Sequence, residues 1–113
     1  MTPDEGFAEM GRLGWSLQMH LREEREADGA WVVCRLLDVL HGLSGRGAAC
    51  RIPADTDLSP AGVQALCGES ADLVVRLRRQ GMPYGGAVVG RLADAVRSLS
   101  ESVDADAREG KTP

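Results

Sequence analysis

The residues with the most reactive side chains gather in one stretch, residues 34–50, which reads CRLLDVLHGLSGRGAAC. Cys34 opens it, Cys50 closes it, and Asp38 and His41 lie between them. A catalytic thiol needs an imidazole within about 3 Å, oriented by a third group. Cys34 and His41 are seven residues apart, which separates their backbones by roughly 10 Å along a helix. Asp38 lies between them and can orient neither, so the spacing predicts no triad and we expect a non-enzymatic protein.

The same side chains are competent metal ligands, because thiolate, carboxylate and imidazole all bind zinc. Their spacing of i, i+4 and i+7 places Cys34, Asp38 and His41 along one stripe of a helix. A structural zinc site brings closely spaced ligand pairs, and the fourth ligand here would have to be Cys50 or His20. We therefore predict no metal and no cofactor. A metal- or thiol-dependent protein centred on Cys34, His41 and Cys50 is the third interpretation of the function.

The only basic run in the sequence is Arg76, Arg78 and Arg79, near the end of a predicted helix. Glu69 and Asp72 precede it at helical spacing, which predicts ion pairs along one exposed face. The net charge of −4 and the isoelectric point of about 5.1 oppose a broad nucleic-acid surface. The alternative function is a helical subunit of a nucleoprotein complex, of a phage or antiviral kind, that contacts phosphate through these three arginines.

The composition predicts a single all-α domain in the cytoplasm. Aromatic residues are 4% of the 113-residue chain, so leucine, valine, alanine and methionine must form the core. No apolar run reaches the length of a membrane span, and the first residues show no secretory leader. The three cysteines include no closely spaced pair, which argues against a disulfide framework. Arginine far outnumbers lysine, as GC-rich genomes favour, and we expect a bacterial source.

Apolar residues recur at steps of three and four along four segments, which is the period of an amphipathic helix. The segments run from Pro3 to before Gly29, from about Asp28 or Ala30 to about Leu43, from Pro60 to before Gly81, and from about Gly85 to Val103. Gly68 is a potential break in the third segment, and a long connection over residues 44–58 precedes that segment. The pattern predicts an antiparallel four-helix bundle over residues 1–103, with residues 104–113 as a frayed tail. No internal repeat of 20 to 50 residues is visible.

The third segment has the clearest start signal. Ser59 followed by Pro60 is typical of an N-cap and a first helical position, and Leu58 and Val63 have the spacing of a hydrophobic staple. The core face predicted for this helix comprises Val63, Leu66, Cys67, Ala71, Val74 and Leu77.

Both tryptophans fall outside the predicted core. Trp15 and Met19 lie off the main apolar stripe of the first helix, and Trp31 lies outside the apolar arc of the second. Tryptophan and methionine are enriched in the cores of protein interfaces. We therefore expect a small interaction module, acting as a homodimer, an adaptor or a small subunit of a larger assembly. Its anchors would be Trp15, Met19 and Trp31, with Cys34 and His41 near the rim; nucleic acid is disfavoured as a partner, and neither membrane contact nor a small-molecule substrate is expected.

Overall fold

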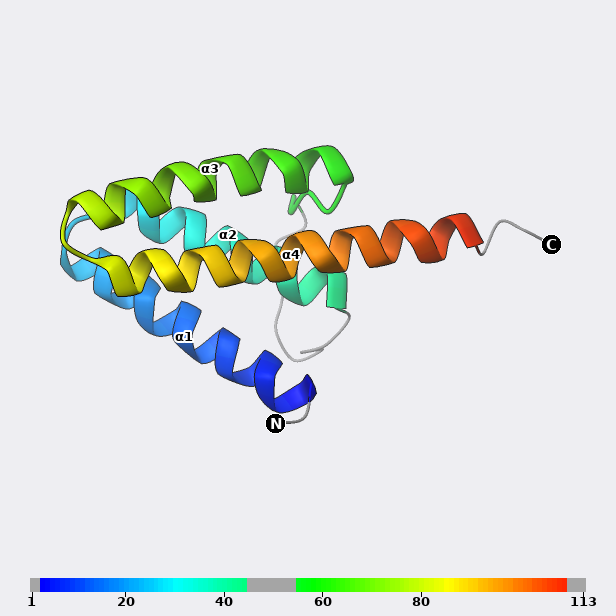
Figure 1. Ribbon diagram of the computed structural model, residues 1–113, viewed down its shortest axis with the longest axis horizontal. Coiled ribbons are helices and arrows are strands. Elements are labelled where there is room, and N and C mark those ends of the chain that lie inside the picture. The colour runs from blue at the N-terminus through cyan, green and yellow to red at the C-terminus, as the bar shows by residue number, and fades with distance from the viewer. Residues whose placement is uncertain (1–2, 45–54, 110–113) are drawn as a thin grey trace.

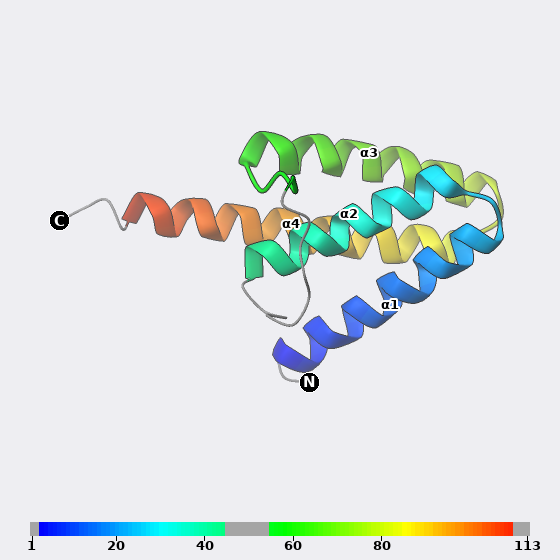
Figure 2. The same cartoon turned by 180° about the vertical axis from the view of Figure 1, so that it is seen from behind.

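The computed structural model shows four α-helices and describes residues 3–44 and 55–109 (Figure 1). The helices are α1 (Pro3–Glu23), α2 (Ala27–Ser44), α3 (Pro60–Arg79) and α4 (Pro83–Glu109). Each helix runs in the direction opposite to that of the helix before it in the chain (Figure 1 and Figure 2). The predicted all-α, four-helix fold is confirmed. Most of the connection between α2 and α3, residues 45–54, lies outside the described residues.

The helix α4 is longer than its apolar pattern indicates. The pattern ends at Val103, after which we expected fraying, but α4 continues to Glu109. The added residues, DADARE, include alanine, arginine and glutamate, which are strong helix formers. Val103 is 44% exposed, and the end of α4 projects past the other helices (Figure 1). Helical propensity rather than burial therefore extends the helix here.

The turn between α1 and α2 is a tight helix stop. The N–H of Arg25 donates to the carbonyl of Arg22 at 3.2 Å, and the N–H of Glu26 donates to the carbonyl of Leu21 at 2.8 Å. These bonds form a Schellman motif, which requires a left-handed residue, and Arg25 has a φ of 61°. Gly29, which we expected to end the first helix, lies inside α2 instead. An added Cβ at Gly29 would meet a leucine methyl group of α3 at 2.9 Å, so the position requires a small residue for packing.

The turn between α3 and α4 repeats this geometry. The N–H of Gly81 donates to the carbonyl of Arg78 at 3.2 Å, and the N–H of Met82 donates to the carbonyl of Leu77 at 2.8 Å. Gly81 has a φ of 78°, a conformation that glycine adopts at no steric cost. Each of these four residues lies 56 positions after its counterpart in the first turn.

The offset of 56 residues relates the two hairpins, α1–α2 and α3–α4, over most of their length. Between residues 17–44 and residues 73–100, 11 of the 28 aligned pairs are identical. The identical pairs are Leu17/Leu73, Leu21/Leu77, Arg22/Arg78, Gly29/Gly85, Val32/Val88, Val33/Val89, Arg35/Arg91, Leu36/Leu92, Asp38/Asp94, Leu43/Leu99 and Ser44/Ser100. The fold is therefore a repeated helical hairpin. This period is longer than the 20 to 50 residues within which the sequence shows no repeat.

The core lies between the two hairpins. The backbones of α2 and α4 each approach those of all three other helices, whereas no Cα atom of α1 comes within 8 Å of a Cα atom of α3. The largest fully buried side chains are Leu21, Leu36, Leu40, Leu73, Leu77, Leu92, Val33, Val39, Val89 and Val96. The predicted aliphatic core is thus present, and the second helix of each hairpin occupies its centre.

The start of α3 agrees with its sequence signal. Ser59 is the N-cap, and its Oγ accepts a hydrogen bond from the N–H of Gly62 at 3.1 Å. Asp57 accepts bonds from the N–H and the Oγ of Ser59, at 2.9 and 2.6 Å, and these bonds hold the pKa of its carboxyl below the usual range. The helix then runs without a break through Gly68, where the sequence suggested one.

The buried face of α3 is rotated from the predicted one. Ser70 and Leu73 are fully buried, whereas Ala71 is exposed and Val74 is only half-buried. Leu73 is the larger hydrophobic side chain, and Ser70 can be buried because its Oγ donates to the carbonyl of Leu66 at 2.8 Å. The helix is therefore turned so that Leu73, rather than the smaller Ala71, faces the core.

Replacing Arg25 with glycine is expected to raise the free energy of unfolding by ~0.5–1 kcal/mol. Relief of the left-handed strain, roughly 1–2 kcal/mol, exceeds the added backbone entropy of glycine, about 0.5–1 kcal/mol. Urea denaturation followed by circular dichroism measures the change. Gly81→Ala is the matched control at the equivalent position, and it should be destabilising, because an added Cβ there meets no atom within 4 Å and only the φ of 78° opposes it. Equal signs for the two variants would contradict the assignment of a shared turn geometry.

Candidate functional site

A groove with a volume of about 600 Å³ lies between α1 and α2. Trp15 and Gln18 of α1 and Cys34, Asp38 and His41 of α2 are among its lining residues. From their shared turn the two helices diverge toward the N-terminal end of α1 (Figure 2). The structure thus gathers on one groove three of the five residues predicted for the interface, Trp15, Cys34 and His41.

The groove begins where α1 and α2 cross closely. A Cβ added to Gly14 would lie 2.8 Å from a methyl carbon of Leu37, so the absence of a side chain at Gly14 allows the contact. Leu37 is buried and forms part of the groove lining. The corresponding pair in the other hairpin is Ser70 and Ala93. At this crossing the first hairpin combines glycine on α1 with leucine on α2. The second hairpin has a small side chain on each helix, serine on α3 and alanine on α4.

The predicted anchors are exposed. Trp15 is 60% exposed, Met19 is 44% exposed and Trp31 is 52% exposed. The guanidinium of Arg35 lies 4.6 Å from the centre of the Trp31 ring, which orients this indole against α2. Trp31 also lines a smaller hollow next to Asp38, and Asp38 belongs to the main groove as well. The two hollows therefore adjoin, with Trp15 at one and Trp31 at the other.

Cys34 has the properties of a packed thiol. Burial raises the pKa of this thiol, the cation of Arg22 opposes that rise, and the charge of Asp38 adds to it. The guanidinium of Arg22 is within 4.0 Å of the sulfur, a weak contact. A nucleophilic cysteine requires a lowered pKa, because the thiolate is the reactive form. The environment of Cys34 therefore favours the unreactive protonated thiol.

Asp38 and His41 follow Cys34 along α2 and line the same groove. His41 Nδ1 lies 2.7 Å from the carbonyl of Leu37, so this nitrogen carries the proton and donates to the backbone. Burial raises the pKa of Asp38, while His41 and Arg35 oppose the shift. Within residues 3–44 and 55–109, no group of three or more histidine, cysteine or acidic side chains is placed to hold a metal. Cys50, the further ligand considered from sequence, lies outside the described residues.

Gln18 is the site residue that the sequence analysis missed. Its side chain is 2% exposed, and its Oε1 has no hydrogen-bond partner among the described residues. A buried acceptor without a partner costs about 1–3 kcal/mol. The counterpart of Gln18 in the second hairpin is Val74, so hairpin packing does not require an amide there. The repeat was the signal that could have identified this residue from the sequence.

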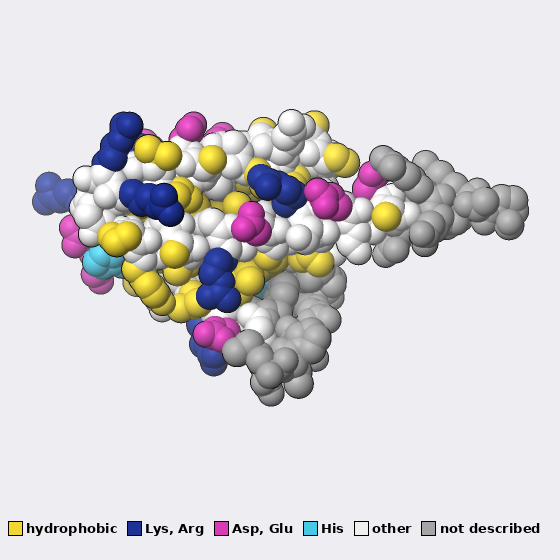
Figure 3. Space-filling view, viewed as in Figure 1, with side chains coloured by type: hydrophobic (Ala, Val, Ile, Leu, Met, Phe, Trp, Pro, Cys, Tyr) yellow, Lys and Arg dark blue, Asp and Glu magenta, His cyan; other side chains and the backbone are white. Residues whose placement is uncertain are grey.

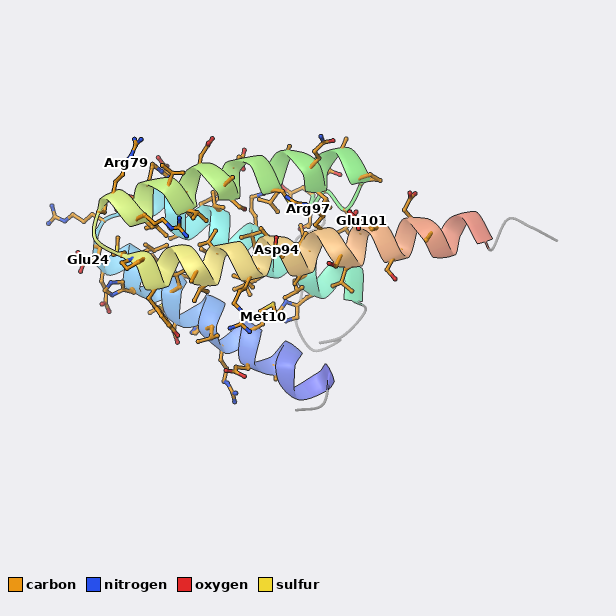
Figure 4. All side chains as sticks on the ribbon, viewed as in Figure 1. Met10, Glu24, Arg79, Asp94, Arg97 and Glu101 are labelled. Carbon is orange, nitrogen blue, oxygen red and sulfur yellow. The ribbon has the colours of Figure 1, made fainter. Side chains whose placement is uncertain are left out.

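The second hairpin provides an internal comparison for the whole groove. A groove of about 630 Å³ lies between α3 and α4 and includes Cys67, Ala71 and Arg97, counterparts of lining residues in the first groove. Arg97 and Glu101 extend from α4 beside α3 (Figure 4). The pairs that differ between the two hairpins include Trp15/Ala71, Gln18/Val74, Trp31/Ala87 and Cys34/Gly90. The same fold therefore forms without either tryptophan or the buried amide.

The arginine run near the end of α3 is partly engaged within the fold. Arg76 pairs with Glu26 of the α1–α2 turn at 3.1 Å, and Gln80 donates to the same carboxylate at 3.3 Å. We had expected Arg76 to pair with Glu69 or Asp72 of its own helix. Its partner is Glu26 instead. This ion pair joins the two hairpins at their turns.

The remaining two arginines do not form a continuous basic surface with their surroundings. An added Cβ at Gly86 would lie 3.6 Å from Cγ of Arg78, so the aliphatic part of Arg78 lies near α4. Arg79 extends outward at the turn end of the molecule (Figure 4). On the face that carries α3 and α4, basic and acidic side chains alternate (Figure 3). Because Arg76 is paired with Glu26, the alternative function would depend on two arginines for phosphate contact, Arg78 and Arg79, rather than on three.

Comparisons with protein-family models, curated proteins and solved structures found no match to this chain. None of the helices in the described part of the chain is both long and apolar enough to cross a membrane.

Alkylation of Cys34 by iodoacetamide is expected to have its midpoint at a higher pH than alkylation of an unstructured cysteine, because burial disfavours the thiolate. Arg22→Ala should move the midpoint further up, since the cation that favours the thiolate is lost, and Asp38→Asn should move it down. Peptide-resolved mass spectrometry separates Cys34 from the other cysteines. Rapid labelling of Cys34 at neutral pH would contradict this description and support a reactive thiol.

Disrupting the contact between Glu26 and Arg76 should have a small effect on stability. The Arg76 side chain is 44% exposed, so solvent screens the pair, and we expect a coupling of about 0.5–1 kcal/mol. A double-mutant cycle with Glu26→Gln and Arg76→Ala, measured by urea denaturation, isolates this coupling. The same cycle between Arg79 and Glu26 is the control and should give no coupling.

Proposed function

We propose that this chain is a non-enzymatic protein–protein interaction module that binds through the outer face of the α1–α2 hairpin. Trp15, Met19 and Trp31 are its anchors, and Cys34 and His41 lie at the edge of the groove. The observation that supports this best is the exposure of both tryptophans beside a groove, when the equivalent positions of the other hairpin hold alanine. The module acts as a homodimer, an adaptor or a small subunit of a larger assembly.

Exposed tryptophan is informative because of its size and shape. An indole exposes a large apolar surface but has few torsions to immobilise, so its burial in a complex is favourable. Trp15 and Met19 are four residues apart on α1 and therefore neighbours on the helix surface. Since the chain has only two tryptophans and both are half exposed or more, neither contributes to the hydrophobic core.

The chemistry of the groove supports binding rather than catalysis. The thiol of Cys34 is favoured in its protonated form, and His41 Nδ1 donates to the backbone of its own helix. The groove has the volume of a site that holds several side chains, and its surface is mainly apolar with a few polar groups. These are the properties of an interface that buries anchor residues.

Replacing Trp15 and Met19 together with glutamine should abolish complex formation while leaving the helical fold intact, because both side chains are exposed. The molecular mass in solution by light scattering and co-purification from the native host measure the loss. The matched control is the double variant Val75→Gln and Tyr84→Gln, which alters two exposed apolar residues of α3 and α4. Unchanged mass and unchanged partners in the first variant would rule out the proposed surface.

A further inference from the structure

We infer that the α1–α2 groove is occupied by a second copy of this chain, related by a twofold axis. In this arrangement Trp15 of each copy enters the groove of the other, where its indole N–H donates to Gln18. The inference rests on the proposed function and adds the identity of the partner. Three properties of the groove support it: its hydrogen-bonding need, its charge and the area available for burial.

The unpaired Oε1 of Gln18 requires a hydrogen-bond donor carried by an apolar group. Gln18 lines the groove but is 2% exposed, so bulk water does not satisfy its acceptor. Rotation about the last torsion of glutamine, which has a broad energy profile, can turn the amide toward the groove. The indole of tryptophan is a donor only, placed at the edge of a large apolar ring. Trp15 offers that donor at the mouth of the same groove, so the chain carries both halves of the interaction.

The charges of the groove allow two copies to meet. The lining carries one arginine, Arg12, and one aspartate, Asp38. The chain as a whole has a net charge of −4, whereas the arginine and the aspartate of this lining balance each other. A twofold axis presents Arg12 and Asp38 of one copy to the same pair of the other copy, and opposite charges can then approach each other.

The two exposed tryptophans supply roughly a third of the area that each partner of a standard interface buries. At exposures of 60% and 52%, the two tryptophans together expose roughly 250 Å². A standard interface buries about 800 Å² on each partner. Met19, Ala8 and the groove itself extend the same surface, so two hairpins packed face to face can reach that size.

The second hairpin explains why association stops at two copies. The second hairpin has Ala71 in place of Trp15 and Val74 in place of Gln18, so it offers neither the donor nor the acceptor. A single self-complementary face produces a closed dimer, whereas two such faces on one molecule would produce an open chain of copies.

Sedimentation equilibrium of the full chain, from about 1 to 200 µM, tests the inference. The wild type is expected to show a reversible monomer–dimer equilibrium in this range. Trp15→Ala should weaken the dimer by at least tenfold, because it removes a central anchor. Trp15→Phe, which keeps a ring but loses the N–H, and Gln18→Val, which copies the second hairpin, should each weaken it by roughly threefold to tenfold. Val75→Ala truncates an exposed apolar side chain of α3 that does not line the groove, and it should leave the dimer unchanged.

Thermal melting of the monomer at low concentration separates a lost contact from misfolding. Gln18→Val should melt at the wild-type temperature or higher, because it removes a buried unpaired acceptor. A dimer weakened to the same extent by Val75→Ala, or one that tolerates Trp15→Phe and Gln18→Val unchanged, would overturn the proposed pairing. A wild type that stays monomeric at 200 µM overturns the inference; if that monomer still binds a different protein through Trp15 and Met19, the proposed function survives. If neither self-association nor any partner depends on these residues, both fail.

Discussion

The contact between α2 and α4 is the constraint on which the arrangement of the other helices depends. Each of these helices lies against all three others, whereas no Cα atom of α1 comes within 8 Å of a Cα atom of α3. Val33 and Leu36 of α2 and their counterparts Val89 and Leu92 of α4 are all fully buried. Because the second helices of both hairpins fill the centre, the first helices are left on the outside, where one face of each meets solvent. The candidate site lies on such an outer helix and its neighbour.

Comparing equivalent positions of the two hairpins separates residues that the shared fold requires from residues that it does not require. The residues kept in both hairpins are mostly aliphatic core positions, together with two arginines, an aspartate, a serine and the glycine that approaches a neighbouring helix. Among the residues that differ, Trp15, Gln18, Trp31 and Cys34 lie at the α1–α2 groove or at the hollow beside it. Two hairpins with the same core positions and different grooves show that core packing does not determine the groove side chains. The proposed interaction accounts for the side chains that core packing leaves open.

The groove also contains features that are unfavourable for the free chain. It keeps an unpaired acceptor at Gln18 and exposes two indoles, and both features lower the stability or solubility of the free chain. The turn beside it contains Arg25 in a left-handed conformation, where the second hairpin has Gly81. In each of these three respects the first hairpin is the less optimised of the two, as functional regions of proteins commonly are.

The sequence alone determined the helices, because their periods and caps depend on neighbouring residues. The aliphatic pattern identified four helices, Ser59 and Pro60 marked the start of α3, and the exclusion of Trp15, Met19 and Trp31 from the core could be inferred from their position on a helical projection. Only the tertiary structure decided what depends on contacts between distant segments. The rotation of α3 toward Leu73, the pairing of Arg76 with Glu26 and the burial of Gln18 without a partner arise from residues far apart in the chain. A local pattern shows which face of a helix is apolar, but the neighbouring helices determine how far that face is turned and which polar atoms they cover.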